Sequence, residues 1–146
     1  MLRDLQVEGQ CEQKAVEIGH RQGGGAVDEQ SPAGAVLAQD SPADSIQVLV
    51  VDGMSDDGTR DIVTRMIGGR PRSRLLDNPM RIVPTAMNIG LEQAEGDLIV
   101  RVDGHTFIAP DYVRRCLEAL DASGADCVGG LMVAVGDSPF AEAVAL

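Results

Sequence analysis

Two short acidic segments of this sequence could do chemistry, and each follows a β-branched, apolar run. The first is Val51–Thr59, with the sequence VDGMSDDGT. Its Asp, Ser and Thr residues are typical of a loop that caps a helix. The alternative is that Asp52 contacts a polar ligand group, such as the base or ribose of a nucleotide. The spacing of the residues leaves both interpretations open.

The second acidic segment is Arg101–Thr106, with the sequence RVDGHT. Asp103 and His105 are separated by one small residue. A carboxylate and an imidazole so placed can both point at one divalent cation that bridges a diphosphate. The alternative, and the commoner outcome for an isolated Asp-x-His, is a solvated turn with His105 exposed.

A third polar segment lies between these two and begins at Asn78-Pro79. Arg81 is a candidate partner for a phosphate group, although a solvated arginine is the commoner outcome for such a residue taken alone. Asn88 falls in the interior of an expected helix, where asparagine is mildly unfavourable. We therefore expect Asn88 to have a hydrogen-bonding role.

An alternation of strands and helices from Ile46 onward must position these segments. Apolar runs predict strands over residues 46–51, 74–76, 98–102 and 127–135. Helical spacing predicts helices from about 57–59 to 67, over 83–94, from Pro110 and, at the end of the chain, from Pro139. The helix from Pro110 is expected to bury Val113, Cys116, Leu117 and Leu120.

This alternation predicts an α/β fold with a mainly parallel sheet. In such sheets ligands bind at the carboxyl ends of the strands, which is where Asp52 and Asp103 stand.

The composition indicates one domain of ordinary size. The 146 residues are 44% hydrophobic and carry a net charge of −11. Coating nucleic acid or an anionic membrane requires a basic face, so we expect no nucleic-acid partner. The sequence has no apolar stretch near the roughly 18 residues of a membrane span and no signal pattern. Its three cysteines lack metal-type spacing and should be reduced thiols, so we expect a cytoplasmic protein.

Residues 1–45 differ in character from the rest of the chain. They hold no long apolar run, and they contain Gly23–Gly25 and two Ser-Pro pairs. We expect residues 1–34 to be an atypical, poorly ordered leader without a clear strand, and residues 35–146 to form the folded part.

The motifs VDGMSDDGT, NP, PTAMNIGLEQAEGDLIVRVDGH and PDYV together resemble family 2 glycosyltransferases of the GT-A fold. The resemblance is nearest to the branch of succinoglycan and other bacterial exopolysaccharide synthesis, and it covers about residues 35–146. It implies an incomplete GT-A domain, the half that binds a nucleotide sugar. The implied activity is transfer of a sugar from a nucleoside-diphosphate donor to a hydroxyl of a glycan or lipid-linked acceptor.

The resemblance also implies roles for individual residues. Substrate-binding roles are implied for Asp52, Ser55, Arg81, Asn88 and Asp103. The family's metal-binding Asp-x-Asp matches Asp103 and His105, and neutral imidazole is a good ligand for manganese, so Mn²⁺ or Mg²⁺ is the expected cofactor. The family's nucleoside-binding acid pair matches Asp52 and Gly53, where glycine replaces the second acid.

Two features of that family are not recognised in the sequence. One is an opening buried strand that ends in a Pro-x-x-Asn-Glu type of turn. The other is the catalytic base, which belongs to a later, acceptor-side segment. We therefore expect no catalytic residue within these residues and interpret the chain as a fragment whose full-length parent works at the cytoplasmic face of the membrane. The alternative is a non-catalytic remnant that at best binds a nucleotide sugar.

Two other enzyme classes fit the sequence less well. A dinucleotide-binding Rossmann domain needs a strand before Gly23–Gly25 and a glycine where Asp28 stands. A haloacid dehalogenase-like phosphatase needs a second aspartate two residues after the strand-end aspartate. This chain has Met54 and His105 at those positions.

Overall fold

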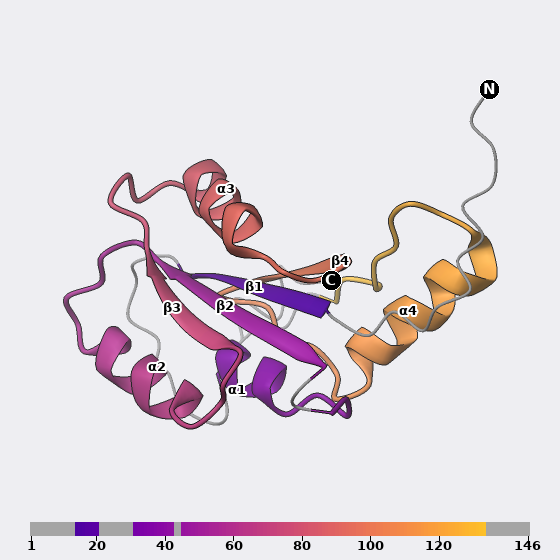
Figure 1. Cartoon of the computed structure of the whole chain (residues 1–146), viewed down its shortest axis with the longest axis horizontal. Coiled ribbons are helices and arrows are strands. Elements are labelled where there is room, and N and C mark those ends of the chain that lie inside the picture. Colours follow the sequence, from indigo (N-terminus) through magenta and orange to yellow (C-terminus); the bar gives the residue numbers. More distant parts are fainter. Residues whose placement is uncertain (1–13, 21–30, 43–44, 134–146) are drawn as a thin grey trace, which may run out of the picture. The chain divides into compact units, whose positions relative to one another are not determined.

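The computed structural model of the protein describes residues 14–20, 31–42 and 45–133. The chain divides into two compact units, residues 1–113 and residues 114–146. Within the described residues, the first unit is a four-stranded sheet with helices on both faces (Figure 1). The predicted α/β class is confirmed.

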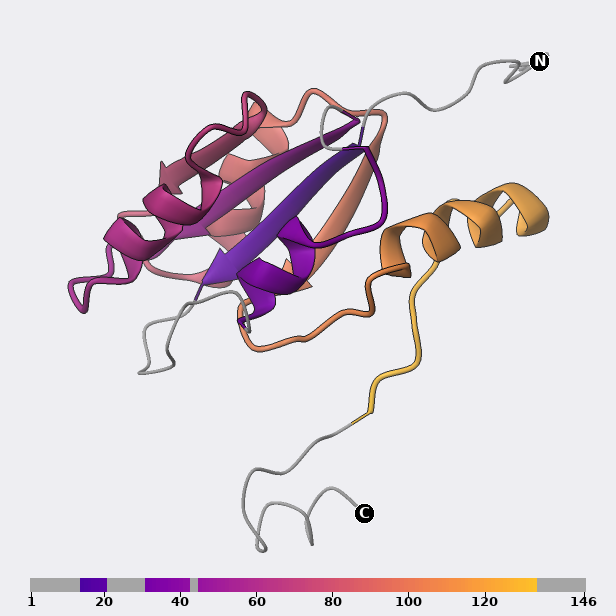
Figure 2. The ribbon, with the colours of Figure 1, turned by 90° about the horizontal axis from the view of Figure 1, so that it is seen from below.

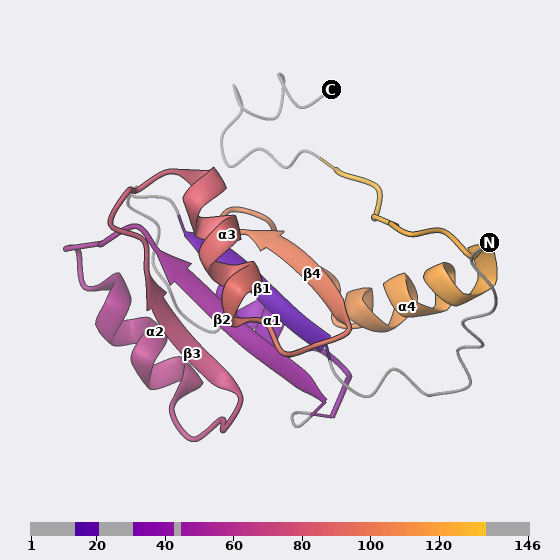
Figure 3. The ribbon, with the colours of Figure 1, turned by 45° about the horizontal axis from the view of Figure 1, so that its top comes forward.

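The described strands of the sheet all run parallel. In the order β3-β2-β1-β4 they are Ser73–Asp77, Ile46–Asp52, Lys14–His20 and Leu98–Asp103. Their carboxyl ends therefore lie at one edge of the sheet, where Figure 3 shows the four arrowheads together. The register pairs Asp52 with Asp77, and it pairs Gly19 of β1 with Asp103. The parallel pairing thus brings three acidic strand ends to the same edge.

Three helices cover the two faces of this sheet. Helices α1 (Pro32–Leu37) and α2 (Thr59–Ile67) lie on one face, and α3 (Val83–Gln93) lies on the other (Figures 1 and 2). Ser31 caps α1, because its Oγ accepts a hydrogen bond from the backbone N–H of Gly34 at 3.3 Å. A fourth helix, α4 (Tyr112–Ser123), begins at the end of the first unit and continues in the second. Among the described residues, no helix is long and apolar enough to cross a membrane.

The core of the first unit is aliphatic and centres on β2. Every residue of β2 is buried, and Leu49 and Val51 are each 1% exposed. Helices α1 and α2 contribute Val36 and Val63. Helix α3 buries Ala86 and Gly90, two small residues one turn apart that permit a close approach to the sheet. The continuous apolar run Val48–Val51 of β2 therefore belongs to a strand covered on both faces.

The expectation of a poorly ordered start without a clear helix or strand is wrong where the structure describes that start. Residues 32–34 begin α1, and residues 14–20 form β1, which lies between β2 and β4 and pairs with both. The sequence pattern of β1 is too weak to predict a strand. Strand formation depends on the neighbouring strands that provide hydrogen-bond partners as much as on residue propensity. The other residues of the expected leader up to residue 30 lie outside the described residues, and the predicted division at residues 34 and 35 stays a prediction.

The strand expected over 127–135 is also wrong over its described residues. Residues 127–133 form neither strand nor helix, and the Leu131 side chain is 94% exposed. Gly129 and Gly130 interrupt the apolar run and weaken any strand there. Residues 134 and 135, and the helix expected from Pro139, lie outside the described residues.

Strands β2, β3 and β4 and helices α2, α3 and α4 lie close to where the sequence predicts them, whereas α1 was not predicted from helical spacing. Two apolar faces are less buried than expected. Of the face predicted for α4, only Val113 is buried, because the described residues 114–133 include no other helix or strand to cover it. On α3, Val83 and Leu91 are 53% and 50% exposed. The helical spacing thus predicts where these helices lie, but it does not predict what each helix face contacts.

Replacing Leu49 with Ala should lower the free energy of unfolding by about 3 kcal/mol, because the fully buried side chain would leave a cavity. Leu91→Ala is the matched control, since that side chain is half exposed and its loss should cost no more than about 0.5 kcal/mol. Urea unfolding followed by circular dichroism measures both. Equal losses for the two variants would contradict the assignment of β2 as the centre of the core.

Candidate functional site

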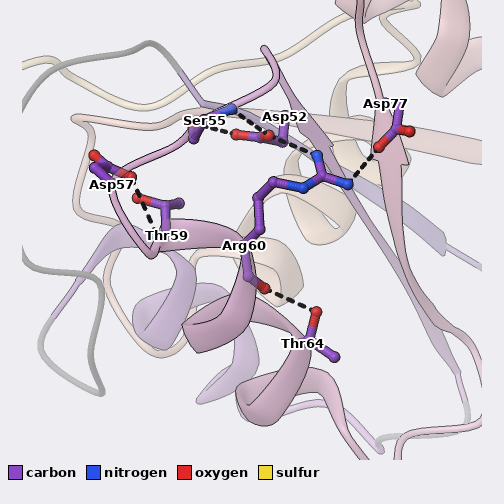
Figure 4. A network of polar contacts seen from close by, with 7 residues as sticks. All are labelled: Asp52, Ser55, Asp57, Thr59, Arg60, Thr64 and Asp77. Atoms are coloured by element: carbon purple, nitrogen blue, oxygen red, sulfur yellow. Dashed lines mark hydrogen bonds and ion pairs between the residues drawn. The ribbon is translucent and has the colours of Figure 1, made fainter.

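The carboxyl edge of the sheet is organised around the Asp52 side chain, which is 1% exposed. Among the described residues, Ser55 and Arg60 donate hydrogen bonds to its carboxylate (Figure 4). Ser55 donates its backbone N–H to Oδ2 at 2.9 Å and its hydroxyl to Oδ1 at 2.6 Å. Arg60 donates from Nη1 to Oδ2 at 2.7 Å. The buried charge is therefore both paired and hydrogen-bonded.

Arg60 bridges Asp52 to a second strand-end carboxylate. Its Nη2 lies 2.6 Å from Oδ1 of Asp77, and Figure 4 shows the guanidinium between the two acids. Asp52 and Asp77 are paired in the register of β2 and β3, so without a cation between them their charges would repel. The Asp77 side chain is 56% exposed, in contrast to that of Asp52. One arginine thus ties α2 to the ends of two neighbouring strands.

The pKa values of this pair follow from these contacts. Burial alone would raise the pKa of Asp52, but the hydrogen bonds from Ser55 and Arg60 and the charge of Arg60 outweigh it, so the pKa is lowered. The hydrogen bonds to Asp52 and Asp77 raise the pKa of Arg60. Both groups are therefore held in their charged forms.

The same contacts shape the loop between β2 and α2. Met54 lies in the left-handed region with φ 61°, enclosed by the hydrogen bond from Ser55 N–H to Asp52. Asp57 Oδ1 then accepts a hydrogen bond from Thr59 N–H at 3.1 Å, at the start of α2. The motif forms the loop between β2 and α2, but the expected side-chain cap is absent at the N-cap of the helix, which is Gly58. A direct contact of Asp52 or Ser55 with a ligand stays a prediction.

A second loop, residues 78–82, follows β3 and is attached to the first. The backbone N–H of Asn78 donates to the carbonyl of Asp52 at 2.8 Å. The buried Asn78 side chain donates from Nδ2 to the Ile82 carbonyl at 2.9 Å and accepts the Thr85 hydroxyl at 2.7 Å. This brace holds exposed Arg81 in the left-handed region, with φ 57°. The predicted phosphate partner therefore projects from a fixed loop at the carboxyl edge.

The end of β4 carries the predicted metal ligands. The Asp103 side chain is 41% exposed, and its Oδ1 lies 2.8 Å from Nε of Arg101. The backbone N–H of Thr106 donates to the Asp103 carbonyl at 2.9 Å, which closes a turn that contains exposed His105. Since β1 separates β2 from β4, the backbones at Asp52 and Asp103 are about 10 Å apart.

The predicted site residues thus fall into three groups. Asp52 and Ser55 are in contact, Arg81 lies in the neighbouring loop, and Asp103 and His105 lie across β1. Asn88 is exposed in α3. Within residues 14–20, 31–42 and 45–133, no three His, Cys, Asp or Glu side chains gather as a metal site. One carboxylate and one imidazole nevertheless fit a cation whose other ligands come from substrate phosphates and water.

Two members of the network, Arg60 and Asp77, were not predicted from the sequence. Asp77 could have been found by the rule that identified Asp52, because it directly follows the run predicted as a strand over 74–76. Arg60 lies in the first turn of α2, where the helix dipole disfavours a cation. An arginine at such a position indicates a carboxylate partner nearby.

Comparison with known proteins connects this edge to a family. The model of "Glycosyl transferase family 2" matches residues 34–145. The succinoglycan biosynthesis protein ExoA of Rhizobium meliloti is 41% identical over 101 residues, which is 68% of this chain and 31% of that protein. The glycosyltransferase AglE of Haloferax volcanii is 30% identical over 66% of this chain and 32% of its own length. The chain thus spans about a third of the length of these relatives.

Solved structures share the fold. S. aureus TarS in complex with UDP superposes with a TM-score of 0.63 at 19% identity, over 84% of this chain and 39% of TarS. The mannosyltransferase PcManGT of Pyrobaculum calidifontis, in complex with GDP-Man and Mn²⁺, superposes with a TM-score of 0.61 at 24% identity, over 74% of this chain and 32% of that enzyme. The GT-A architecture expected from the sequence is confirmed.

Replacing Asp52 with Asn should lower the free energy of unfolding by about 2 kcal/mol at pH 7, because hydrogen bonds to an ionised group are lost. The pKa of Asp52 is lowered in the folded state, so its contribution is present above the ordinary carboxyl value of about 4. It is lost as the pH falls through the folded pKa, and the difference between wild type and variant should then shrink.

Urea unfolding at a series of pH values measures this difference. Asp56→Asn is the control, because Asp56 is an exposed acid in the same loop. A difference between wild type and the Asp52 variant that stays constant with pH would contradict the proposed ionisation of Asp52.

Proposed function

Since the chain belongs to glycosyl transferase family 2, we propose that the carboxyl edge of its sheet binds a nucleoside-diphosphate sugar for transfer to an acceptor hydroxyl. The observation that carries this proposal is the meeting of two acidic strand ends, at Asp52 and Asp103, at one edge within the matched residues. The loop after Asp52 is rigidly built, while Asp103 stays partly open to solvent. A fixed cradle beside an accessible carboxylate suits a ligand with both a nucleoside and a diphosphate.

The comparisons support the class of donor and the biological setting. The solved structures that share this fold include complexes with UDP, with UDP-GlcNAc, and with GDP-Man and Mn²⁺. Two related proteins, ExoA and ExoO of Rhizobium meliloti, are named for succinoglycan biosynthesis. We therefore propose a role in exopolysaccharide synthesis. A glycan or lipid-linked acceptor and, for a full-length protein, work at the cytoplasmic face of a membrane are part of the same proposal.

The donor's diphosphate would be recognised by groups that favour negative charge. Helices α2 and α3 both begin at the carboxyl edge, and within the described structure neither has a side-chain hydrogen bond at its N-cap. Their helix dipoles favour an anion at this edge, although the first N–H of α2, that of Thr59, already donates to Asp57. Arg81 projects from the loop just before α3 and supplies a formal positive charge. Asn88, exposed further along α3, is the assigned contact for a polar group of the donor.

Asp103 and His105 would hold the divalent cation of the donor complex. When bound, Mn²⁺ or Mg²⁺ supplies positive charge that stabilises the departing nucleoside diphosphate. Asp103 is ready for this role because its ion pair with Arg101 is exposed on both sides and so is weak. His105 lies in a turn that no described packing covers, so its imidazole can adjust to the cation.

Replacing Asp103 with Ala should abolish the part of UDP affinity that depends on Mn²⁺ while leaving the fold intact, because a half-exposed loop carboxylate supports little packing. Isothermal titration calorimetry with UDP and with UDP sugars, in Mn²⁺ and in a chelator, measures this. The wild type should bind more tightly with Mn²⁺.

Asp97→Ala is the matched control, since Asp97 is exposed just before the opposite end of β4. It should bind UDP as the wild type does. Metal-dependent affinity that survives in the Asp103 variant, or unfolding of that variant, would contradict the assigned role. Absence of nucleotide binding by the wild type in both conditions would refute the donor site itself.

A further inference from the structure

We propose that Arg60 is a positioning residue for donor binding: by bridging Asp52 and Asp77 it holds the loops after β2 and β3 in the conformation that a nucleoside diphosphate contacts. This inference rests on the proposed function and deepens it, because it identifies what pre-organises the site. No ligand contact is assigned to Arg60 itself, since its two terminal nitrogens already face carboxylates.

The geometry of the bridge uses the shape of the guanidinium. Nη1 and Nη2 each bind a different carboxylate, at 2.7 and 2.6 Å. A planar fork with two separate donors can fix the two acids relative to each other, whereas a lysine ammonium is a single point of charge. The carboxylates belong to neighbouring strands, so the bridge sets the positions from which both loops start.

Both loops that leave these strand ends contain strained backbone. Met54 and Arg81 are the described non-glycine residues with positive φ, at 61° and 57°. Each lies a few residues after a carboxylate that Arg60 holds. Left-handed conformations of such residues cost energy and persist only where surrounding contacts fix them, typically at ligand sites. The bridge and the brace at Asn78 supply such contacts on this edge.

Arg60 also sets the charge that the ligand meets. Asp52 and Asp77 would together place two negative charges beside an anionic diphosphate, and the single positive charge of Arg60 offsets one of them. The helix dipole disfavours a cation in the first turn of α2, where Arg60 lies. The attraction of the two carboxylates offsets this electrostatic cost. Its position is therefore explained by the acids it joins.

The test measures UDP affinity of the whole chain by calorimetry, with and without Mn²⁺, at a temperature where circular dichroism shows each variant to be folded. Arg60→Gln should bind UDP about tenfold more weakly, the loss typical of removing a residue that orients ligand-contacting groups. Arg60→Lys keeps the charge but not the fork, and its affinity should be closer to that of Arg60→Gln than to the wild type. Arg65→Gln, an exposed arginine on the same helix, should bind as the wild type does.

Asp77→Asn provides a second route that leaves buried Asp52 paired with Arg60. It should also weaken UDP binding, and the double variant with Arg60→Gln should bind no more weakly than Arg60→Gln alone, because both changes break one bridge. The Asp77→Asn single variant decides the question where Arg60→Gln fails to fold.

The outcomes separate the two proposals. No UDP binding by the wild type refutes the donor site, and the inference falls with it. Wild-type binding that Arg60→Gln and Asp77→Asn leave unchanged refutes the positioning role alone. A lower unfolding temperature with unchanged affinity shows a purely structural bridge and also refutes it. Wild-type affinity in Arg60→Lys shows that charge suffices and overturns the role of the fork.

Discussion

The arrangement of the carboxyl edge depends on one buried charge. Asp52 ends β2, in which every residue is buried, and its side chain is 1% exposed. A carboxylate removed from water is strongly destabilising unless it is paired and hydrogen-bonded. The chain meets that requirement with Ser55 and Arg60, and doing so bends the loop at Met54 and draws the start of α2 toward β2. The shape of the loop thus follows from the need to provide hydrogen bonds and an ion pair for the buried Asp52 carboxylate.

The parallel register extends this constraint to the neighbouring strands. Because β2 and β3 end together, Asp77 lies beside Asp52, and the same arginine serves both. Because β1 lies between β2 and β4, Asp103 stands apart from that pair and keeps its own exposed partner, Arg101. The edge therefore has two parts. Around Asp52 the charges and hydrogen bonds are satisfied within the protein, whereas Asp103 is partly exposed to solvent.

Sequence patterns predicted the elements whose signals are local. The apolar run Val48–Val51 of β2 and the helical spacing of α2 each identify their element without reference to the rest of the chain. Residues 14–20 could not be identified so, because their pattern is weak and their strand is defined by ladders to segments about 30 and 80 residues away. The apolar residues after Cys127 show the converse, since a suitable composition formed no strand over 127–133.

The same distinction applies to the candidate site. Asp52 and Asp103 were identified because each directly follows a recognisable strand. The bridge by Arg60 was not, because it requires the register between β2 and β3, which no linear spacing reveals. A residue whose role depends on adjacent residues can be predicted from the sequence. A residue that joins two strands can be identified only once the pairing of those strands is known.

An acidic edge is at first sight a poor place for an anionic ligand, and the two kinds of ion pair explain how it could serve. The Arg60 pair with buried Asp52 cannot be opened without leaving a charge stranded in the protein, so it fixes geometry. The Arg101 pair with Asp103 is exposed on both sides and contributes at most about 1 kcal/mol, so a cation can replace the arginine at little cost. In the proposed site, Asp52 is the carboxylate that must stay in place, and it has the strong partner. Asp103 is the carboxylate proposed to bind the cation, and it has the weak partner. The two side chains differ in burial, at 1% and 41% exposed.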